Sequence, residues 1–195
     1  MSHQTLIAYI NRQIASPLTE EECALIQEYF VPKKLRKHQF LLQEGDISKW
    51  AGFVVKGALK MYTVDETGRE NILGLFLENW WAGDRESFAN GTPSPYFIDA
   101  FEDSELLVMT KEVFNAHFKN QRFVAELTRT LTERQALKLL KRVHATKTLT
   151  AEQRLLDLEK TYPEFIQRFP QHIIASYLGM TKETLSRIRA QMIKK

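Results

Sequence analysis

The amino-acid sequence predicts an α+β protein in which a β-rich segment lies between helical segments. Two patterns indicate this arrangement. From His38 to Thr110, Gly, Asp and Pro divide the chain into short apolar runs, which is typical of a β-sandwich or barrel. From Lys111 to Tyr162 there is no Gly or Pro, so this part is expected to be helical throughout. The length of 195 residues suits one sizeable domain and a smaller one.

Residues 1–30 are expected to form helices that flank the β-rich segment. Leu6, Ile10 and Ile14 recur every four residues, which is helical spacing. Ser16-Pro17 and Val31-Pro32 interrupt the pattern and are expected to break the region into separate pieces.

Short strands are expected through the β-rich segment. The turn Asp65-Glu66-Thr67-Gly68 predicts a β-hairpin between two of them. The segment from Gly83 to Pro95 is rich in Gly, Pro and Ser and is expected to be a loop. The expected strands are 39–43, 51–55, 58–64, 71–77, 96–101 and 105–110.

A long helix follows, and its apolar residues allow two interpretations. The apolar stripe would suit a parallel coiled-coil dimer, although Arg134 and Lys138 interrupt it where a strict heptad needs apolar residues. Alternatively, the helix packs against its own β domain. We favour the dimerisation helix. The stripe consists of Val124, Leu127, Leu131, Leu140 and Val143.

The segment after Pro170 has the spacing of a helix-turn-helix. Ala175 is small where two crossing helices approach, and Gly179 suits the left-handed turn between them. Thr181 is a suitable N-cap for the second helix. The apolar residues expected beneath both helices are Ile174, Leu178, Met180, Leu185 and Ile188.

The second helix would present a polar surface suited to the major groove of DNA. Glu can accept a hydrogen bond from cytosine, and Arg can bind guanine or a phosphate. An ordinary helical hairpin with a charged outer face is the alternative. The predicted DNA-binding residues are Thr181, Lys182, Glu183, Thr184, Ser186, Arg187 and Arg189.

The charge distribution supports a nucleic-acid-binding C-terminal part. Residues 1–133 carry 14 Lys and Arg against 19 Asp and Glu, a net charge of −5. Residues 134–195 carry 13 Lys and Arg against 5 Asp and Glu, a net charge of +8. A basic segment joined to an acidic one is the pattern expected of a protein that binds DNA at one end.

Other protein classes find little support in the sequence. The single Cys23 excludes a disulfide framework and a four-cysteine metal site within one chain. No phosphate-binding Gly-rich loop, nucleophile elbow or metal-spaced His pair is present, so we expect neither catalytic residues nor a metal site. No membrane span or signal peptide is expected, which makes the cytoplasm the default compartment.

The order of these segments resembles the Crp/Fnr superfamily of transcription regulators. The matching motifs are Gly45-Asp46, Lys56-Gly57, Gly83-Asp84 and the segment ASYLGMTKETLSR at 175–187. The resemblance implies a jelly-roll domain of the cyclic-nucleotide-binding type. It also assigns base contacts to Lys182, Glu183 and Arg187.

The resemblance places a candidate effector pocket at Gly83, Asp84, Arg85, Ser94 and Pro95. In the superfamily a Gly-Glu pair holds the ribose and an Arg-Ser or Arg-Thr pair neutralises the cyclic phosphate. Here Gly83-Asp84 corresponds to the first pair and Ser94-Pro95 to the second, so the phosphate-binding Arg is missing. We therefore expect no cAMP bound in the usual geometry, and the effector is unknown.

The resulting hypothesis is a homodimeric regulator that binds an inverted repeat in double-stranded DNA and would contact RNA polymerase if it is an activator. The expected divisions are an effector domain at 1–111, a dimerisation helix at 112–146 and a DNA-binding domain at 147–195. No C-terminal wing is expected after the second helix, and Lys194 and Lys195 would replace some of its phosphate contacts. A ligand-binding module that acts through protein contacts, with weak or no specific DNA binding, is the alternative.

Overall fold

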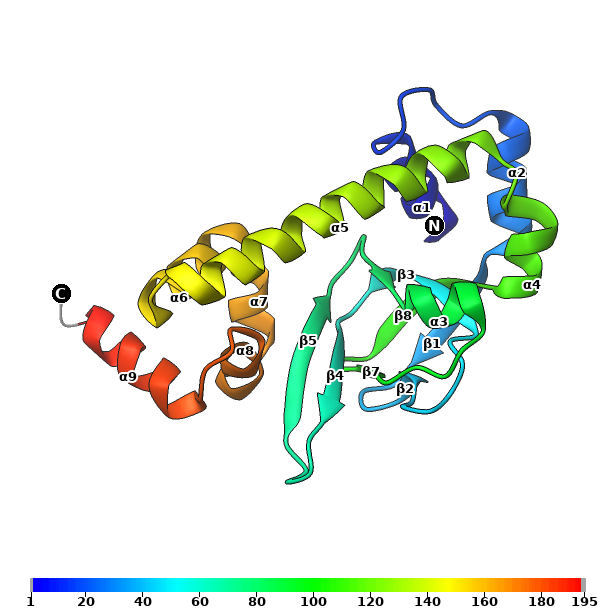
Figure 1. Ribbon diagram of the computed structural model, residues 1–195. Helices are drawn as coiled ribbons and strands as arrows, with labels where there is room; N and C mark the ends of the chain where they lie inside the picture. The colour runs from blue at the N-terminus through cyan, green and yellow to red at the C-terminus, as the bar shows by residue number, and fades with distance from the viewer. Residues whose placement is uncertain (1, 194–195) are drawn as a thin grey trace. The chain divides into compact units, whose positions relative to one another are not determined.

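The computed structural model describes residues 2–193, which form two compact units (Figure 1). The first, called the β unit, contains the chain up to Thr63 together with Leu75–Glu133. The second, called the C-terminal unit, contains Val64–Gly74 and the chain from Arg134 onward. The boundary therefore falls within the long helix α5 (Arg122–Thr148).

Two antiparallel sheets form the centre of the β unit, which confirms the predicted β-rich domain. One sheet has the strand order β1-β8-β3-β6, and the other has the order β2-β7-β4-β5. The strands of the first are β1 (Val31–Leu35), β8 (Ser104–Thr110), β3 (Trp50–Lys56) and β6 (Trp81–Ala82). Those of the second are β2 (Phe40–Leu42), β7 (Phe97–Ala100), β4 (Leu59–Val64) and β5 (Glu70–Phe76).

The side chains of the central strands point alternately to the two faces of the sheet, and this divides the buried residues into two cores. Successive side chains of a strand point to opposite faces, so neighbours such as Phe53 and Val54 enter different cores. Val54 and Leu106 pack with Leu59 and Ile98 of the other sheet, which places this core between the two sheets.

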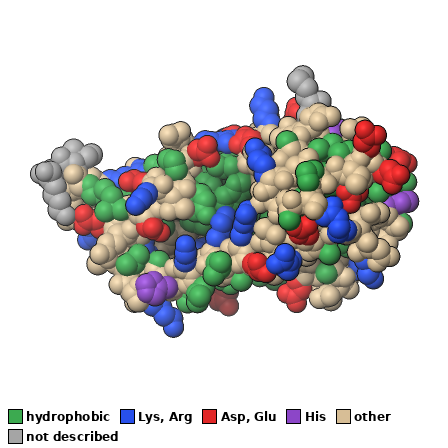
Figure 2. Space-filling model, turned by 90° about the horizontal axis from the view of Figure 1, so that it is seen from above, with side chains coloured by type: hydrophobic (Ala, Val, Ile, Leu, Met, Phe, Trp, Pro, Cys, Tyr) green, Lys and Arg blue, Asp and Glu red, His purple; other side chains and the backbone are tan. Residues whose placement is uncertain are grey.

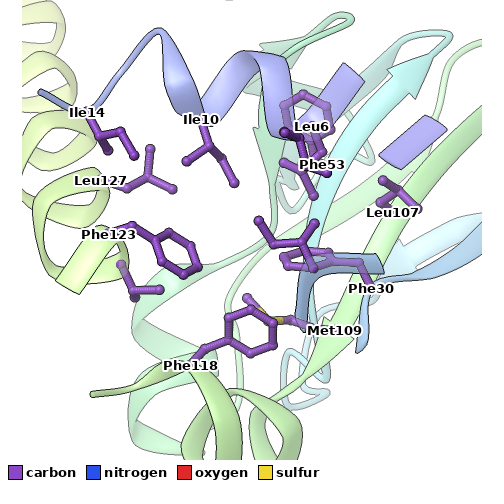
Figure 3. Packing of buried hydrophobic residues seen from close by; sticks show 13 residues of the cluster. Leu6, Ile10, Ile14, Phe30, Phe53, Leu107, Met109, Phe118, Phe123 and Leu127 are labelled. Carbon is purple, nitrogen blue, oxygen red and sulfur yellow. The ribbon is translucent and has the colours of Figure 1, made fainter. Parts of the chain in front are cut away.

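The second core lies between the first sheet and the surrounding helices (Figure 3). Leu6 and Ile10 of α1 (Ser2–Asn11) face Phe53, and Phe123 and Leu127 of α5 join them. The helix α2 (Glu20–Tyr29), the short α4 (Lys111–Val113) and the π-helix η1 (Phe114–Phe118) complete the cover. The first part of α5 thus packs against its own β domain, which was one of the two interpretations of this helix.

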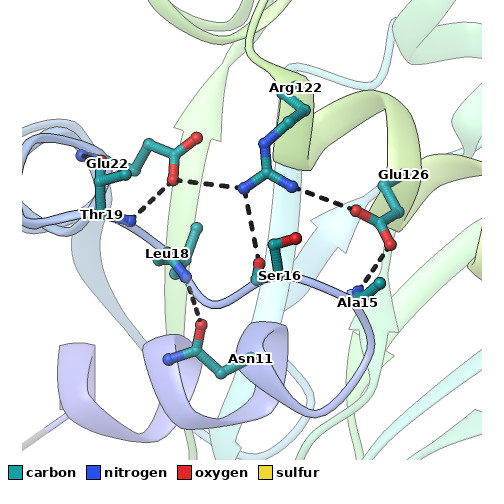
Figure 4. Close-up of polar contacts among 8 residues, drawn as sticks. All are labelled: Asn11, Ala15, Ser16, Leu18, Thr19, Glu22, Arg122 and Glu126. Atoms are coloured by element: carbon teal, nitrogen blue, oxygen red, sulfur yellow. Dashed lines mark hydrogen bonds and ion pairs between the residues drawn. The ribbon is translucent and has the colours of Figure 1, made fainter.

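A polar network fastens the N-terminal segment to the start of α5 (Figure 4). The Arg122 guanidinium lies 3.9 Å from the Glu22 carboxylate and 3.4 Å from that of Glu126. Glu126 in turn accepts a hydrogen bond from the Ala15 amide. Glu22 also closes the capping box of α2 with Thr19.

The segment expected to be helical throughout from Lys111 is interrupted at 119–121, before α5 begins. Three further elements of the β unit differ from the sequence prediction. Residues 31–35 form β1, where Pro32 was expected only to interrupt a helix; β1 is an edge strand, and proline is tolerated there. The two-residue strand β6 is too short to leave a sequence pattern. The predicted loop between Gly83 and Pro95 contains the helix α3 (Arg85–Asn90), which Asp84 caps.

Four helices of the C-terminal unit pack around one apolar centre. They are α6 (Ala151–Thr161), α7 (Pro163–Arg168), α8 (Gln171–Tyr177) and α9 (Lys182–Ile193), whereas the second part of α5, residues 134–148, belongs to the unit but supplies no buried side chain. Leu155, Phe165, Ile174 and Leu185 come from four different helices and are almost completely buried. Pro163 starts α7 at a position where a missing amide hydrogen costs nothing.

Candidate nucleic-acid interface

The turn between α8 and α9 has the geometry expected of a helix-turn-helix. Gly179 adopts a left-handed conformation with φ of +67°. The amide of Met180 donates a 2.9 Å hydrogen bond to the carbonyl of Ala175, which closes a Schellman-type end to α8. Ala175 is 1% exposed, as the close approach of the two helices requires.

The start of α9 is capped as predicted. The hydroxyl of Thr181 accepts a 3.2 Å hydrogen bond from the Thr184 amide. Leu185 and Ile188 are buried against the rest of the unit, whereas Leu178 and Met180 are only half-buried. This orientation leaves the opposite side of α9 exposed.

Most of the predicted DNA-binding side chains lie together on that exposed side. Thr181, Lys182, Glu183, Ser186 and Arg187 are exposed, and Thr184 is half-buried beside them. The Arg187 guanidinium lies 3.5 Å from the Thr184 hydroxyl, so both belong to one polar surface.

Arg189 has a different environment. Its guanidinium lies 3.8 Å from the carboxylate of Glu159, and both side chains are about one-third exposed or less. This ion pair joins α9 to α6. Arg189 is therefore oriented by the packing of the unit, and its contact with DNA stays a prediction.

Glu183 is held in its charged form. Hydrogen bonds from its own backbone amide and from Thr181 lower the pKa of its carboxyl, and the charges of Lys182 and Arg69 act in the same direction. An ionised carboxylate only accepts hydrogen bonds. Glu183 can therefore pair with a donor such as the amino group of cytosine.

The second part of α5 carries an apolar surface open to solvent. Leu137, Leu139, Leu140 and Val143 are all exposed, with Leu140 at 66%. A shallow groove on this helix is lined by Leu139, Arg142, Val143, Thr146 and Lys147. Figure 2 shows hydrophobic side chains gathered at the surface with Lys and Arg beside them.

The residues of the candidate effector pocket already have partners within the β unit. The Asp84 carboxylate accepts hydrogen bonds from the amides of Glu86 and Ser87, at 3.0 and 3.2 Å. The Arg85 guanidinium donates a 2.9 Å hydrogen bond to the Thr132 hydroxyl on α5. Gly83 has φ of +147°, and a Cβ there would lie 3.1 Å from the Trp50 carbonyl.

The second pair of that pocket does not fit a cyclic phosphate. The Ser94 side chain is 2% exposed and accepts a hydrogen bond from the Tyr96 amide. Pro95 is exposed and has no amide hydrogen to donate. A phosphate buried here would lack the cationic partner that it needs. The pocket assignment of all five residues, Gly83, Asp84, Arg85, Ser94 and Pro95, stays a prediction.

Two residues that the sequence did not single out for a role connect parts of the C-terminal unit. Ser176 and Arg142 both bond the backbone of β5, at residues 70–73. Their partners lie roughly seventy to a hundred positions away in the sequence. No pattern in the local sequence predicts such contacts.

Two features are absent from residues 2–193. Within them no three His, Cys, Asp or Glu side chains are grouped so that they could hold a metal ion. None of the helices in that range is both long and apolar enough to cross a membrane. Lys194 and Lys195, predicted to contact phosphates, lie outside the described residues.

Comparisons with known proteins agree with this fold. Residues 32–121 match the family of cyclic nucleotide-binding domains. The chain is 26% identical to the fumarate and nitrate reduction regulatory protein of Vibrio cholerae over 93% of its own length and 78% of the relative. It is 29% identical, with the same coverage, to the fumarate nitrate reduction regulatory protein of Klebsiella oxytoca. Both relatives are regulatory proteins, which agrees with the expectation that the chain is not an enzyme.

Two solved structures show the same architecture. FixK2 from Bradyrhizobium japonicum superimposes with a TM-score of 0.69 at 19% identity, over 85% of each chain. A crp/fnr-family regulator from Eubacterium rectale gives a TM-score of 0.68 at 16% identity, over 91% of this chain and 85% of that one. The likeness therefore includes both the β-rich and the helical parts.

Proposed function

We propose that the chain is a regulator of the Crp/Fnr type, which controls transcription by sequence-specific binding to double-stranded DNA. The exposed start of α9 is the observation that carries the proposal. Lys182, Glu183 and Arg187 lie there on one polar side, while the other side of the helix is buried. This is the arrangement that a helix needs to enter a major groove.

The base contacts would be divided among these three residues. Arg187 would bind guanine, Glu183 would accept from cytosine, and Lys182 would supply a further donor or a phosphate contact. Thr181, Thr184 and Ser186 would hydrogen-bond phosphates or base edges around them. The net charge of +8 over residues 134–195 supplies the attraction to the phosphate backbone.

The active form is proposed to be a homodimer joined along α5. Leu137 and Leu140 are three residues apart and strongly exposed, as are the core positions of a coiled coil before pairing. A twofold dimer would place its two α9 helices in successive major grooves, roughly 34 Å apart. The target would then be an inverted repeat, and an activator would in addition contact RNA polymerase.

The β unit is the proposed place of effector control. An effector bound there would act by favouring one of two arrangements of the regulator. Asp84, Arg85 and Ser94 already form hydrogen bonds within the β unit. These bonds support an effector other than a cyclic nucleotide held in the usual way.

Selection of genomic DNA tests the proposal directly. Sheared DNA from the source organism is captured on the purified protein at two salt concentrations and sequenced. An inverted repeat that stays enriched at the higher salt is the expected result, because base contacts outlast the screening of phosphate contacts. Uniform recovery that disappears with salt would reject sequence-specific binding and favour a module that acts through protein contacts.

A further inference from the structure

The hairpin between β4 and β5 packs with the C-terminal helices. Residues 64–74 belong to the C-terminal unit, although the strands on either side of them continue into the β unit. β5 is the last strand of its sheet, so one side of its backbone is left without a strand partner.

Ser176 of α8 bonds this backbone with a single hydroxyl. Its Oγ accepts a 2.9 Å hydrogen bond from the Ile72 amide and donates a 3.0 Å hydrogen bond to the Glu70 carbonyl. The hydroxyl therefore occupies a place on the strand edge that a neighbouring strand would otherwise take. Ile72 itself is 2% exposed, so its side chain is buried as well.

Arg142 of α5 makes the second attachment. Its guanidinium donates hydrogen bonds of 2.7 Å to the Leu73 carbonyl and 3.0 Å to the Tyr177 carbonyl. A third contact, at 3.4 Å, reaches the Ile72 carbonyl. One side chain thus joins the hairpin, α5 and α8.

The charge of the hairpin is opposite to that of the helices that it contacts. Residues 64–74 have a net charge of −2, because they contain Asp65, Glu66 and Glu70 but only one basic residue, Arg69. Residues 134–195 have a net charge of +8. Ser176 lies three residues before the turn at Gly179 that leads into α9, so the docked strand is close to this end of the helix-turn-helix. DNA phosphates approaching this end of α9 would meet an acidic hairpin and be repelled.

We infer that the β4–β5 hairpin is an autoinhibitory element, which docks on Ser176 and Arg142 and competes with DNA for the start of α9. The inference rests on the proposed DNA-binding function. Since the hairpin continues β4 and β5, an effector that binds the β unit more tightly when the hairpin is undocked would promote DNA binding.

The affinity test compares two variants with matched controls on the duplex that genomic selection identifies. Ser176→Ala removes the edge contact and is expected to bind DNA about 3-fold to 10-fold more tightly. Glu66→Gln removes one exposed charge and is expected to bind about 2-fold more tightly. Ser16→Ala and Glu86→Gln make the same chemical changes at exposed sites in the β unit and are expected to bind as the unmodified protein does.

Hydrogen exchange of the Ile72 amide measures docking itself. Exchange is expected to be faster in Ser176→Ala, and faster in the unmodified protein once the duplex is added. The autoinhibitory role is overturned if the Ile72 amide exchanges more slowly, or at the same rate, when DNA is added. It is also overturned if both variants bind DNA no more tightly than the unmodified protein does. Either result leaves the proposed DNA binding intact. If neither the unmodified protein nor Ser176→Ala binds any duplex specifically, the proposed function fails as well.

Discussion

The guanidinium of Arg142 lies over the ring of Tyr177, 4.3 Å from the ring centroid, and also donates to the Tyr177 carbonyl. A single side chain of α5 therefore fixes the end of α8 by two contacts. Burial raises the pKa of the half-buried Tyr177 hydroxyl above its ordinary value. The long helix and the helix-turn-helix are joined at this point.

Arg142→Gln is expected to loosen the end of α8. The cation–π contact and the hydrogen bonds to backbone carbonyls together contribute about 1–2 kcal/mol. Amide hydrogens of α8 should consequently exchange about 5-fold to 30-fold faster in the variant. Lys141→Gln removes the same charge from the neighbouring exposed position and should leave exchange unchanged. Equal exchange in both variants would show that Arg142 does not hold α8.

The exposed leucines of α5 give a prediction for the oligomeric state. Replacing Leu137 and Leu140 by Arg in one variant should raise the dimer dissociation constant by about 100-fold or more, because each copy loses two apolar contacts. Sedimentation equilibrium measures the change. Leu156→Arg is the control, since Leu156 is 45% exposed on α6. If the double variant stays dimeric, the dimer interface does not include Leu137 and Leu140.

The sequence predicts the helix-turn-helix well because its signals are local. The left-handed Gly179, the small Ala175 and the N-cap Thr181 each occupy the position that its chemistry requires. The central strands are predictable for the same reason, since apolar runs and turn residues alternate there. Both features depend on residues only a few positions apart.

Other elements depend on contacts that the sequence does not display. β1 carries Pro32 and Lys33 because it lies at a sheet edge, so it lacks the pattern of a buried strand. α3 lies in a Gly- and Pro-rich segment, although the N-cap Asp84 and the left-handed Gly91 mark its ends in retrospect. The bond between Ser176 and Ile72 joins residues 104 positions apart and has no local signal at all.

Arg187 is expected to determine sequence specificity. Arg187→Ala should weaken binding to the selected inverted repeat by about 1–3 kcal/mol per half-site, with a much smaller effect on random duplex. Fluorescence anisotropy on both duplexes gives the two affinities. Lys160→Ala removes the same charge from an exposed position on α6 and should lower neither affinity appreciably. Equal losses on both duplexes would mean that Arg187 contacts phosphates only.

The lowered pKa of Glu183 leads to a prediction about acidity. Because the pKa lies below its ordinary value, the carboxylate stays ionised at neutral pH and begins to protonate only as the pH falls through the lowered pKa. The preference for cytosine that an accepting carboxylate provides should therefore be constant from about pH 7 to about pH 5. The preference is measured as the ratio of the affinity for the selected inverted repeat to the affinity for a duplex in which thymine replaces the contacted cytosine.

Glu183→Gln provides the comparison, because an amide can both donate and accept and does not titrate in this range. The variant should lose most of the preference at every pH, whereas the unmodified protein should keep it throughout. Arg69→Ala removes one of the neighbouring positive charges, so the preference should begin to fail at a slightly higher pH. If the preference for cytosine declines in the unmodified protein between about pH 7 and pH 6, a different titrating group provides it. If the preference survives Glu183→Gln, another side chain of α9 provides it.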